Sequence, residues 1–138
     1  MQSNGVNPVE EILWEGRPLA YVVRAHFTPA TTTFITPTEL EQQVGFVVYP
    51  SGAEIHRHVH RGLDRVTTGA AEVILVRRGA CEVEVYSPGR EEVGKWILKT
   101  GDLMLMVSGG HGFRMLEDTV LMEIKQGPYV GREEKELF

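Results

Sequence analysis

Residues 71–86, AEVILVRRGACEVEVY, decide the fold class of this chain. Up to Arg78 they are rich in Val and Ile, and Gly79 interrupts the run. Beyond the glycine, apolar and polar side chains alternate, with Cys81, Val83 and Val85 set against Glu82, Glu84 and Tyr86. Successive side chains of a strand point to opposite faces, so the stretch predicts two β-strands separated by a break at Gly79.

Similar segments recur along the 138 residues of the chain. Each is β-prone and ends at turn residues, as at Pro50-Ser51-Gly52 and Gly101-Asp102. The strands predicted in this way are 19–25, 31–35, 44–49, 55–60, 71–78, 81–86, 93–98, 103–107, 111–116 and 120–126. About ten short strands at a spacing of roughly ten residues predict an all-β sandwich or barrel.

Helical signals are short and confined to the ends and one connection. Asn7 precedes Pro8 in the way that a helix cap precedes the first helical residue, which suggests one turn over 7–11. Residues 38–43 could form another turn behind Thr36 or Thr38. The charged tail, 132–137, is either a frayed terminus or a short helix.

Three of the five histidines, His56, His58 and His60, fall in the predicted strand 55–60. Side chains two apart on a strand share a face, and their Cα atoms lie roughly 7 Å apart. Strand periodicity therefore places adjacent imidazoles within reach of one cation. Neutral imidazole is a common ligand of Zn, Fe, Ni and Cu ions, so the pattern predicts a metal or catalytic cluster.

The residues around these histidines resemble the first motif of the cupin family. That motif is a glycine, five residues and then His-x-His, which places Gly52 before the pair His58 and His60. The motif continues with a glutamate followed six residues later by glycine, matched by Glu72 and Gly79. The second cupin motif, from a glycine to a histidine, is similar to the segment from Gly101 to His111.

The resemblance implies a single cupin domain over 1–138, a double-stranded β-helix or jelly-roll barrel. Its barrel core would span 44–126, with N-terminal strands in 11–43 and a tail at 127–138. The resemblance also implies one divalent transition metal, Fe, Mn, Ni or Zn, held by three histidines and one glutamate. The implied ligands are His58, His60, Glu72 and His111.

The sequence departs from the cupin pattern at three places. Eleven residues, 61–71, separate His60 from Glu72 where the motif has three or four, which leaves Glu72 the less certain ligand. Val107 stands in place of the proline of the second motif. His56 adds a third imidazole, so the metal pair could instead be His56 and His58.

Composition and charge narrow the function classes. The net charge of −5 and the absence of a basic stripe argue against nucleic-acid binding. No apolar run is long enough for a membrane span, and 1–11 lacks the features of a secretory signal. The lone cysteine, Cys81, excludes an internal disulfide, and we expect a cytoplasmic protein.

The function expected from the resemblance is a small-molecule enzyme of the dioxygenase or isomerase type. One alternative is a metal-free sugar-nucleotide isomerase or epimerase with a histidine general base, and another is a non-catalytic ligand-binding cupin. His56 and Arg114 are the candidate catalytic residues, and Arg114 could either bind a carboxylate or phosphate or form a salt bridge at the rim. A local group of arginines is either a solvated rim or a feature that attracts an anionic ligand: Arg57, Arg61, Arg65, Arg77 and Arg78. We also expect a homodimer, because pairing would cover exposed sheet edges.

Overall fold

The computed structural model describes residues 7–69 and 71–138, and it confirms the all-β prediction. Ten strands pair antiparallel, and these described ranges contain no α-helix, only the 3-10 helix η1 (Gly131–Glu134). The strands are β1 (Val9–Trp14), β2 (Arg17–Val23), β3 (Thr33–Phe34), β4 (Gly45–Phe46), β5 (Glu72–Arg78), β6 (Ala80–Tyr86), β7 (Glu92–Lys99), β8 (Leu103–Met106), β9 (Gly110–Met115) and β10 (Val120–Lys125). No helix among the described residues has the length and apolar character needed to cross a membrane.

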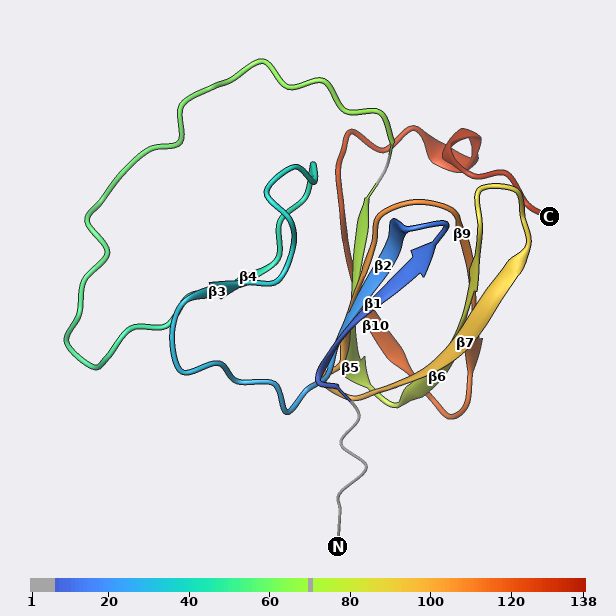
Figure 1. Cartoon of the computed structure of the whole chain (residues 1–138), viewed down its shortest axis with the longest axis horizontal. Helices are drawn as coiled ribbons and strands as arrows, with labels where there is room; N and C mark the ends of the chain where they lie inside the picture. The colour runs from blue at the N-terminus through green and yellow to red at the C-terminus, as the bar shows by residue number, and fades with distance from the viewer. Residues whose placement is uncertain (1–6, 70) are drawn as a thin grey trace, which may run out of the picture. The chain divides into compact units, whose positions relative to one another are not determined.

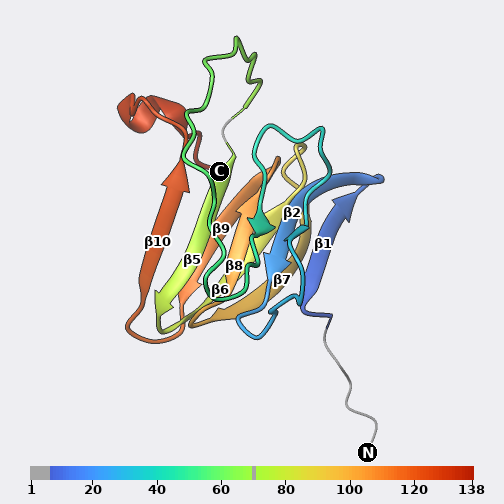
Figure 2. The same cartoon turned by 90° about the vertical axis from the view of Figure 1, so that its left-hand side faces the viewer.

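The chain divides into two compact units. Residues 7–27 and 71–138 form the first, here called the sandwich unit, and residues 28–69 form the second, here called the loop unit. The sandwich unit contains a five-stranded sheet in the order β1-β2-β8-β5-β10 and a three-stranded sheet in the order β7-β6-β9. Figure 2 shows β10 and β1 at the two edges of the larger sheet.

A hydrophobic core lies between the two sheets of the sandwich unit. The alternation in β6 places Cys81, Val83 and Val85 in this core, as predicted, each almost fully buried. The five-stranded sheet contributes inward-facing side chains from β1, β2, β5 and β8, namely Ile12, Leu19, Ala20, Val22, Ile74, Val76, Met104 and Met106. Burial of this apolar surface from both sheets is the main force that holds them together.

Successive strands of the sandwich unit change sheets repeatedly (Figure 1). β5 lies in the larger sheet, β6 and β7 in the smaller, β8 in the larger, β9 in the smaller and β10 in the larger. Three of these crossings use glycines with positive φ, Gly79 (92°), Gly101 (89°) and Gly109 (78°), a backbone region that side chains disfavour. The crossings place residues near the start of β5 opposite residues near the start of β9.

A buried carboxylate closes the end of the sandwich unit at the β7–β8 turn. Asp102 accepts hydrogen bonds from the backbone N–H groups of Ala25 (2.8 Å) and Lys99 (2.9 Å). It also pairs with the Arg24 guanidinium at 3.1 Å, and Arg24 donates to the Ile97 carbonyl. Buried charges are tolerated when they are paired and hydrogen-bonded in this way.

Two local predictions near the N-terminus are wrong. Residues 9–11 begin β1 rather than a helical turn, because pairing with β2 satisfies their backbone and buries Ile12. Residues 38–43 form turns, in which the Gln43 amide donates to the carbonyls of Pro37 and Leu40. Short helical signals are weak, and tertiary pairing overrides them.

The loop unit contains only the two-residue pair β3–β4. Residues 55–60, predicted as a strand, have no regular secondary structure, and the same holds for the rest of 53–68. A strand needs a neighbouring ladder for its backbone groups, and the short β3–β4 pair stops at Phe46. The two ends of this irregular segment are linked through Glu41, whose carboxylate accepts hydrogen bonds from the backbone N–H and the hydroxyl of Thr68.

Candidate functional site

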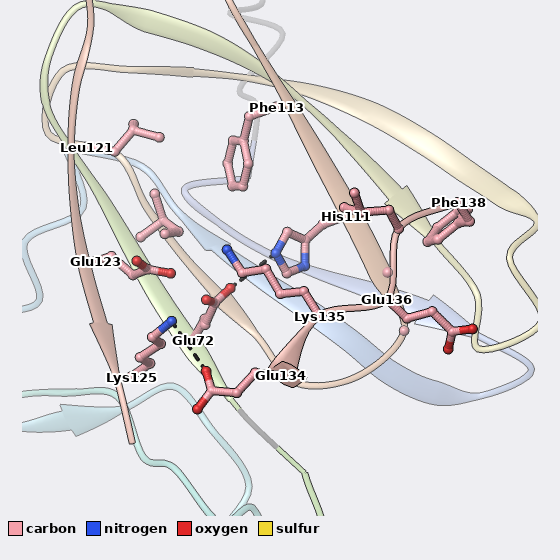
Figure 3. Close-up of a pocket in the computed structure, with 14 residues that line it drawn as sticks. Glu72, His111, Phe113, Leu121, Glu123, Lys125, Glu134, Lys135, Glu136 and Phe138 are labelled. Atoms are coloured by element: carbon pink, nitrogen blue, oxygen red, sulfur yellow. Dashed lines mark ion pairs between the residues drawn. The ribbon is translucent and has the colours of Figure 1, made fainter. Parts of the chain in front are cut away.

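A cavity of about 660 Å³ opens at the end of the sandwich unit opposite Asp102 (Figure 3). Its walls come from β5, β9 and β10 and from the C-terminal residues 134–138. Ile74, Phe113 and Leu121 form an apolar wall that continues the core. This size and mixed lining are typical of small-molecule sites.

Glu72 and His111 face one another in this cavity. Glu72 is the first residue of β5 and His111 the second of β9, and both alternate with inward-facing core residues. The His111 Nε2 atom lies 3.1 Å from Glu72 Oε2, and their side chains are 31% and 12% exposed. The structure therefore brings together two of the four residues predicted as metal ligands.

Two further charged groups of β10 share this face. Glu123 and Lys125 alternate with Leu121, so their side chains point into the cavity alongside Glu72. The hydrogen bond from His111 lowers the pKa of Glu72 to about 2 against the opposing effect of burial, and Glu123 and Lys125 lower it further. The hydrogen bond to Glu72, with burial, raises the pKa of Glu123. The two carboxyl groups therefore titrate together, and Glu123 is the one that takes up a proton first as the pH falls.

The C-terminal segment, residues 131–138, closes one side of the cavity. Glu134 pairs with Lys125 at 3.6 Å, and Glu136 pairs with Arg90 at 2.9 Å. The Phe138 ring packs edge-on against Tyr86, with centroids 5.1 Å apart, and the Arg90 guanidinium lies 5.2 Å from its centroid. These contacts hold the segment against the strands.

The three clustered histidines lie in the loop unit and are exposed. The rings of His58 and His60 have centroids 5.2 Å apart. The His58 Nδ1–H donates to the His56 carbonyl at 2.9 Å, which leaves Nε2 of His58 with its lone pair free. A backbone acceptor of this kind commonly orients a metal-binding histidine. His56 contributes its backbone carbonyl to this hydrogen bond.

Arg114, the other candidate catalytic residue, lies on the face of β9 opposite His111. Three positions separate the two residues, so strand alternation directs them to opposite sides of the sheet. The Arg114 side chain is 71% exposed and pairs with Glu82 at 3.4 Å. Its position therefore gives no support to a role in the cavity.

The predicted group of arginines is divided. Arg57, Arg61 and Arg65 are exposed in the loop unit, whereas Arg77 and Arg78 end β5. The end of β5 lies about 20 Å along the strand from Glu72. Arg77 and Arg78 therefore do not line the cavity.

Within the part of the chain that the structure describes, no group of three or more His, Cys, Asp or Glu side chains is arranged to hold a metal ion. The candidate ligands instead form two pairs, Glu72–His111 and His58–His60, one in each unit. Sequence reasoning missed Glu123, Lys125 and Lys135. The alternation of Leu121, Glu123 and Lys125 within the predicted strand 120–126 was a usable signal for the first two.

Comparison of the chain with protein-family models, curated proteins and solved structures gives no match. The case for a function therefore depends on the residues and geometry described above.

Proposed function

We propose that this protein is a metal-binding cupin that acts on a small molecule in the cavity of the sandwich unit. The single observation that carries the proposal is the Glu72–His111 contact across the cavity. The two residues come from separate cupin-like motifs and from strands of different sheets. The repeated change of sheet from β5 to β10 supports a jelly-roll barrel as the finer description of the fold.

The donor atoms fit a divalent transition metal. A ligand carboxylate must be ionised to bind metal, and the lowered pKa of Glu72 favours that state. The proposed ligand set is His58, His60, Glu72 and His111.

A bound metal would supply Lewis acidity or, with Fe or Mn, a site for dioxygen. The residues of the cavity would do the remaining work. Phe113 and Leu121 exclude water from one side of a ligand, and the raised pKa of Glu123, caused by its hydrogen bond to Glu72 and by burial, makes this carboxyl a candidate proton carrier. These features favour an enzyme of the dioxygenase or isomerase type over a storage protein.

The His111–Glu72 hydrogen bond also favours a second candidate, a metal-free isomerase or epimerase. An imidazole oriented by a carboxylate is a common general base. In that case His111 would take a proton from a carbon of the substrate, and Glu72 would orient the ring. The predicted homodimer, the cytoplasmic location and the lack of nucleic-acid and membrane partners stay predictions.

Metal content per chain, measured by elemental mass spectrometry on untagged protein, separates the two candidates. We expect a near-stoichiometric metal that is lost in His58→Ala, His60→Ala and His111→Ala. His26→Ala is the matched control, and His56→Ala should also keep the metal because only its backbone carbonyl is used. If His56→Ala lost the metal and His60→Ala kept it, the two histidine ligands of the loop unit would be His56 and His58.

Glu72→Ala tests the glutamate by the same measurement. Loss of metal would make Glu72 a ligand, and retention would leave a site of three histidines. Absence of metal from the parent, even after reconstitution with Fe, Mn, Ni and Zn, would overturn the metal proposal. Turnover that depends on His111 and Glu72 without metal would then favour the acid–base candidate.

A further inference from the structure

The C-terminal segment, residues 131–138, lies outside the two sheets and along one side of the cavity. Figure 1 shows it running from the end of β10 toward the β6–β7 turn, so it passes from the larger sheet to the smaller. Residues 134–138 all line the cavity, and Figure 3 shows Lys135 beside the Glu72–His111 pair. A ligand that approaches the pair from this side therefore meets the segment first.

Side-chain contacts hold this segment on the strands. Its Glu134 pairs with Lys125 of β10 at 3.6 Å, and its Glu136 pairs with Arg90 at 2.9 Å. Among the residues that the structure describes, no backbone hydrogen bond links 131–138 to a strand. The side chains of Arg90 and Glu136 are 49% and 83% exposed, and exposed ion pairs contribute little and weaken with salt. The segment can therefore detach without breaking a β-ladder.

The Phe138 ring anchors the far end of the segment on the outer face of the smaller sheet. It packs edge-on against Tyr86 and lies over Gly110, where an added Cβ would come 2.9 Å from the ring. Gly110 is not among the glycines with positive φ, so its place in β9 requires space for the ring rather than a special backbone conformation. Strand alternation directs the neighbouring His111 to the opposite face, toward the cavity.

The near end of the segment has a point at which it can turn. Gly131 has a φ of 85°, and a Cβ added there would find no atom within 4 Å. A glycine in open space permits the backbone rotation that a hinge requires. The chain just before it stays attached to β10, because the Lys125 ammonium lies 5.4 Å from the centroid of the Tyr129 ring.

We infer that residues 131–138 form a strap that opens and closes the cavity. In the closed state the Phe138 ring is packed on the smaller sheet and both ion pairs are formed. In the open state the ring leaves this position, the ion pairs break and the segment turns about Gly131, so that a small molecule reaches or leaves Glu72 and His111. The inference goes beyond the proposed function, since it takes the cavity as a ligand site but requires neither a metal nor a particular reaction.

The test uses diethyl pyrocarbonate as a probe and measures how fast it modifies His111 in chelator-treated protein, by peptide mass spectrometry. The exposed His26 in the same sample gives the reference rate. Phe138→Ala removes the anchoring ring, and we expect it to speed the modification of His111 about threefold relative to His26, in line with the loss of one aromatic contact. Gly110→Ala should act in the same direction, because its methyl group displaces the ring.

Gly112→Ala is the matched control for Gly110→Ala. The two glycines flank His111 on β9, but a Cβ at Gly112 would find its nearest neighbour, the Glu84 carboxylate, at 3.7 Å and would not meet the strap. Amide hydrogen exchange of the same variants shows whether the opening is local. We expect faster exchange in 131–138 and unchanged exchange in β5, β9 and β10.

An unchanged His111 rate in either Phe138→Ala or Gly110→Ala would overturn the inference. Equal acceleration in Gly112→Ala, or faster exchange throughout the three strands, would also overturn it, because the effect would then come from a disturbed sheet. Neither readout depends on metal content. The expected rates in a protein that takes up no metal would uphold the strap and reject the metal proposal, and unchanged rates in a protein that binds metal would do the reverse.

Discussion

Glu72 and His111 lie 3.1 Å apart although they belong to strands of different sheets. Their contact exists because the chain changes sheet three times between them, near Gly79, Gly101 and Gly109. The interaction holds a negative charge in a cavity whose lining also includes the apolar side chains of Ile74 and Leu121. It makes both the stability and the chemistry of the site sensitive to protonation.

Stability should fall in acid through Glu72. Its pKa is about 2 in the folded protein, below the ordinary value of 4.5, so folding favours the ionised form. This contribution is present above about pH 4.5 and is lost as the pH falls towards 2. Its size is on the order of a few kcal/mol, since each pKa unit corresponds to about 1.4 kcal/mol.

Glu72→Gln should flatten this acid dependence of the free energy of unfolding, measured by urea denaturation of chelator-treated protein. Exposed Glu91→Gln, which lies outside the cavity, serves as the control. The raised pKa of Glu123 acts in the opposite sense, so the measured slope should be smaller than Glu72 alone would give. Identical slopes for parent and Glu72→Gln would contradict the assignment.

Glu123→Gln should leave the protein as stable as the parent at neutral pH or stabilise it by about 1 kcal/mol. The raised pKa of Glu123 means that ionisation of this residue opposes folding as the pH rises. An amide keeps a donor for the Glu72 carboxylate and cannot ionise. Thermal and urea unfolding would check this, with Glu123→Leu, which lacks the donor, as the comparison. A clear loss of stability in Glu123→Gln would show that the ionised form is needed.

Gly109→Ala should lower the free energy of unfolding by about 2 kcal/mol or more. Gly109 has a φ of 78°, and an added Cβ would overlap the carbonyl oxygen of Tyr86. The same change should disturb the start of β9 and hence His111. Gly112→Ala is the matched control, because its Cβ would find its nearest neighbour at 3.7 Å. Equal stability of the two variants would refute the argument.

Asp102→Ala should destabilise the protein by about 3 kcal/mol, because it leaves Arg24 and two backbone N–H groups without their acceptor. Asp102 lies at the end of the sandwich unit remote from the cavity, so folded Asp102→Ala should take up metal like the parent. Calorimetry and elemental analysis of the same samples would separate these effects. A similar loss of stability in exposed Asp64→Ala would indicate a general charge effect.

The sequence predicted segments that overlap seven of the eight strands of the sandwich unit, β2 and β5 to β10, but it did not predict β1. Alternation in 81–86 and the glycine at 79 describe β5 and β6 because strand periodicity is a local property that neighbouring residues express. The same reasoning failed at 55–60, where the alternating histidines resemble a strand but no ladder partner is present for their backbone. Local pattern is a necessary condition for a strand, and pairing decides whether it forms.

Only the tertiary structure decided which side chains meet. Glu72, His111 and Glu123 come from three strands, and their proximity depends on sheet order and register, which are set by contacts between distant parts of the chain. Lys135 carries no pattern of its own in the sequence and enters the cavity because ion pairs on both sides hold its segment there. The amino-acid sequence determined which side chains could bind a ligand or metal. Long-range packing determined which of them share a cavity, because contacts between distant residues form only after the chain has folded back on itself.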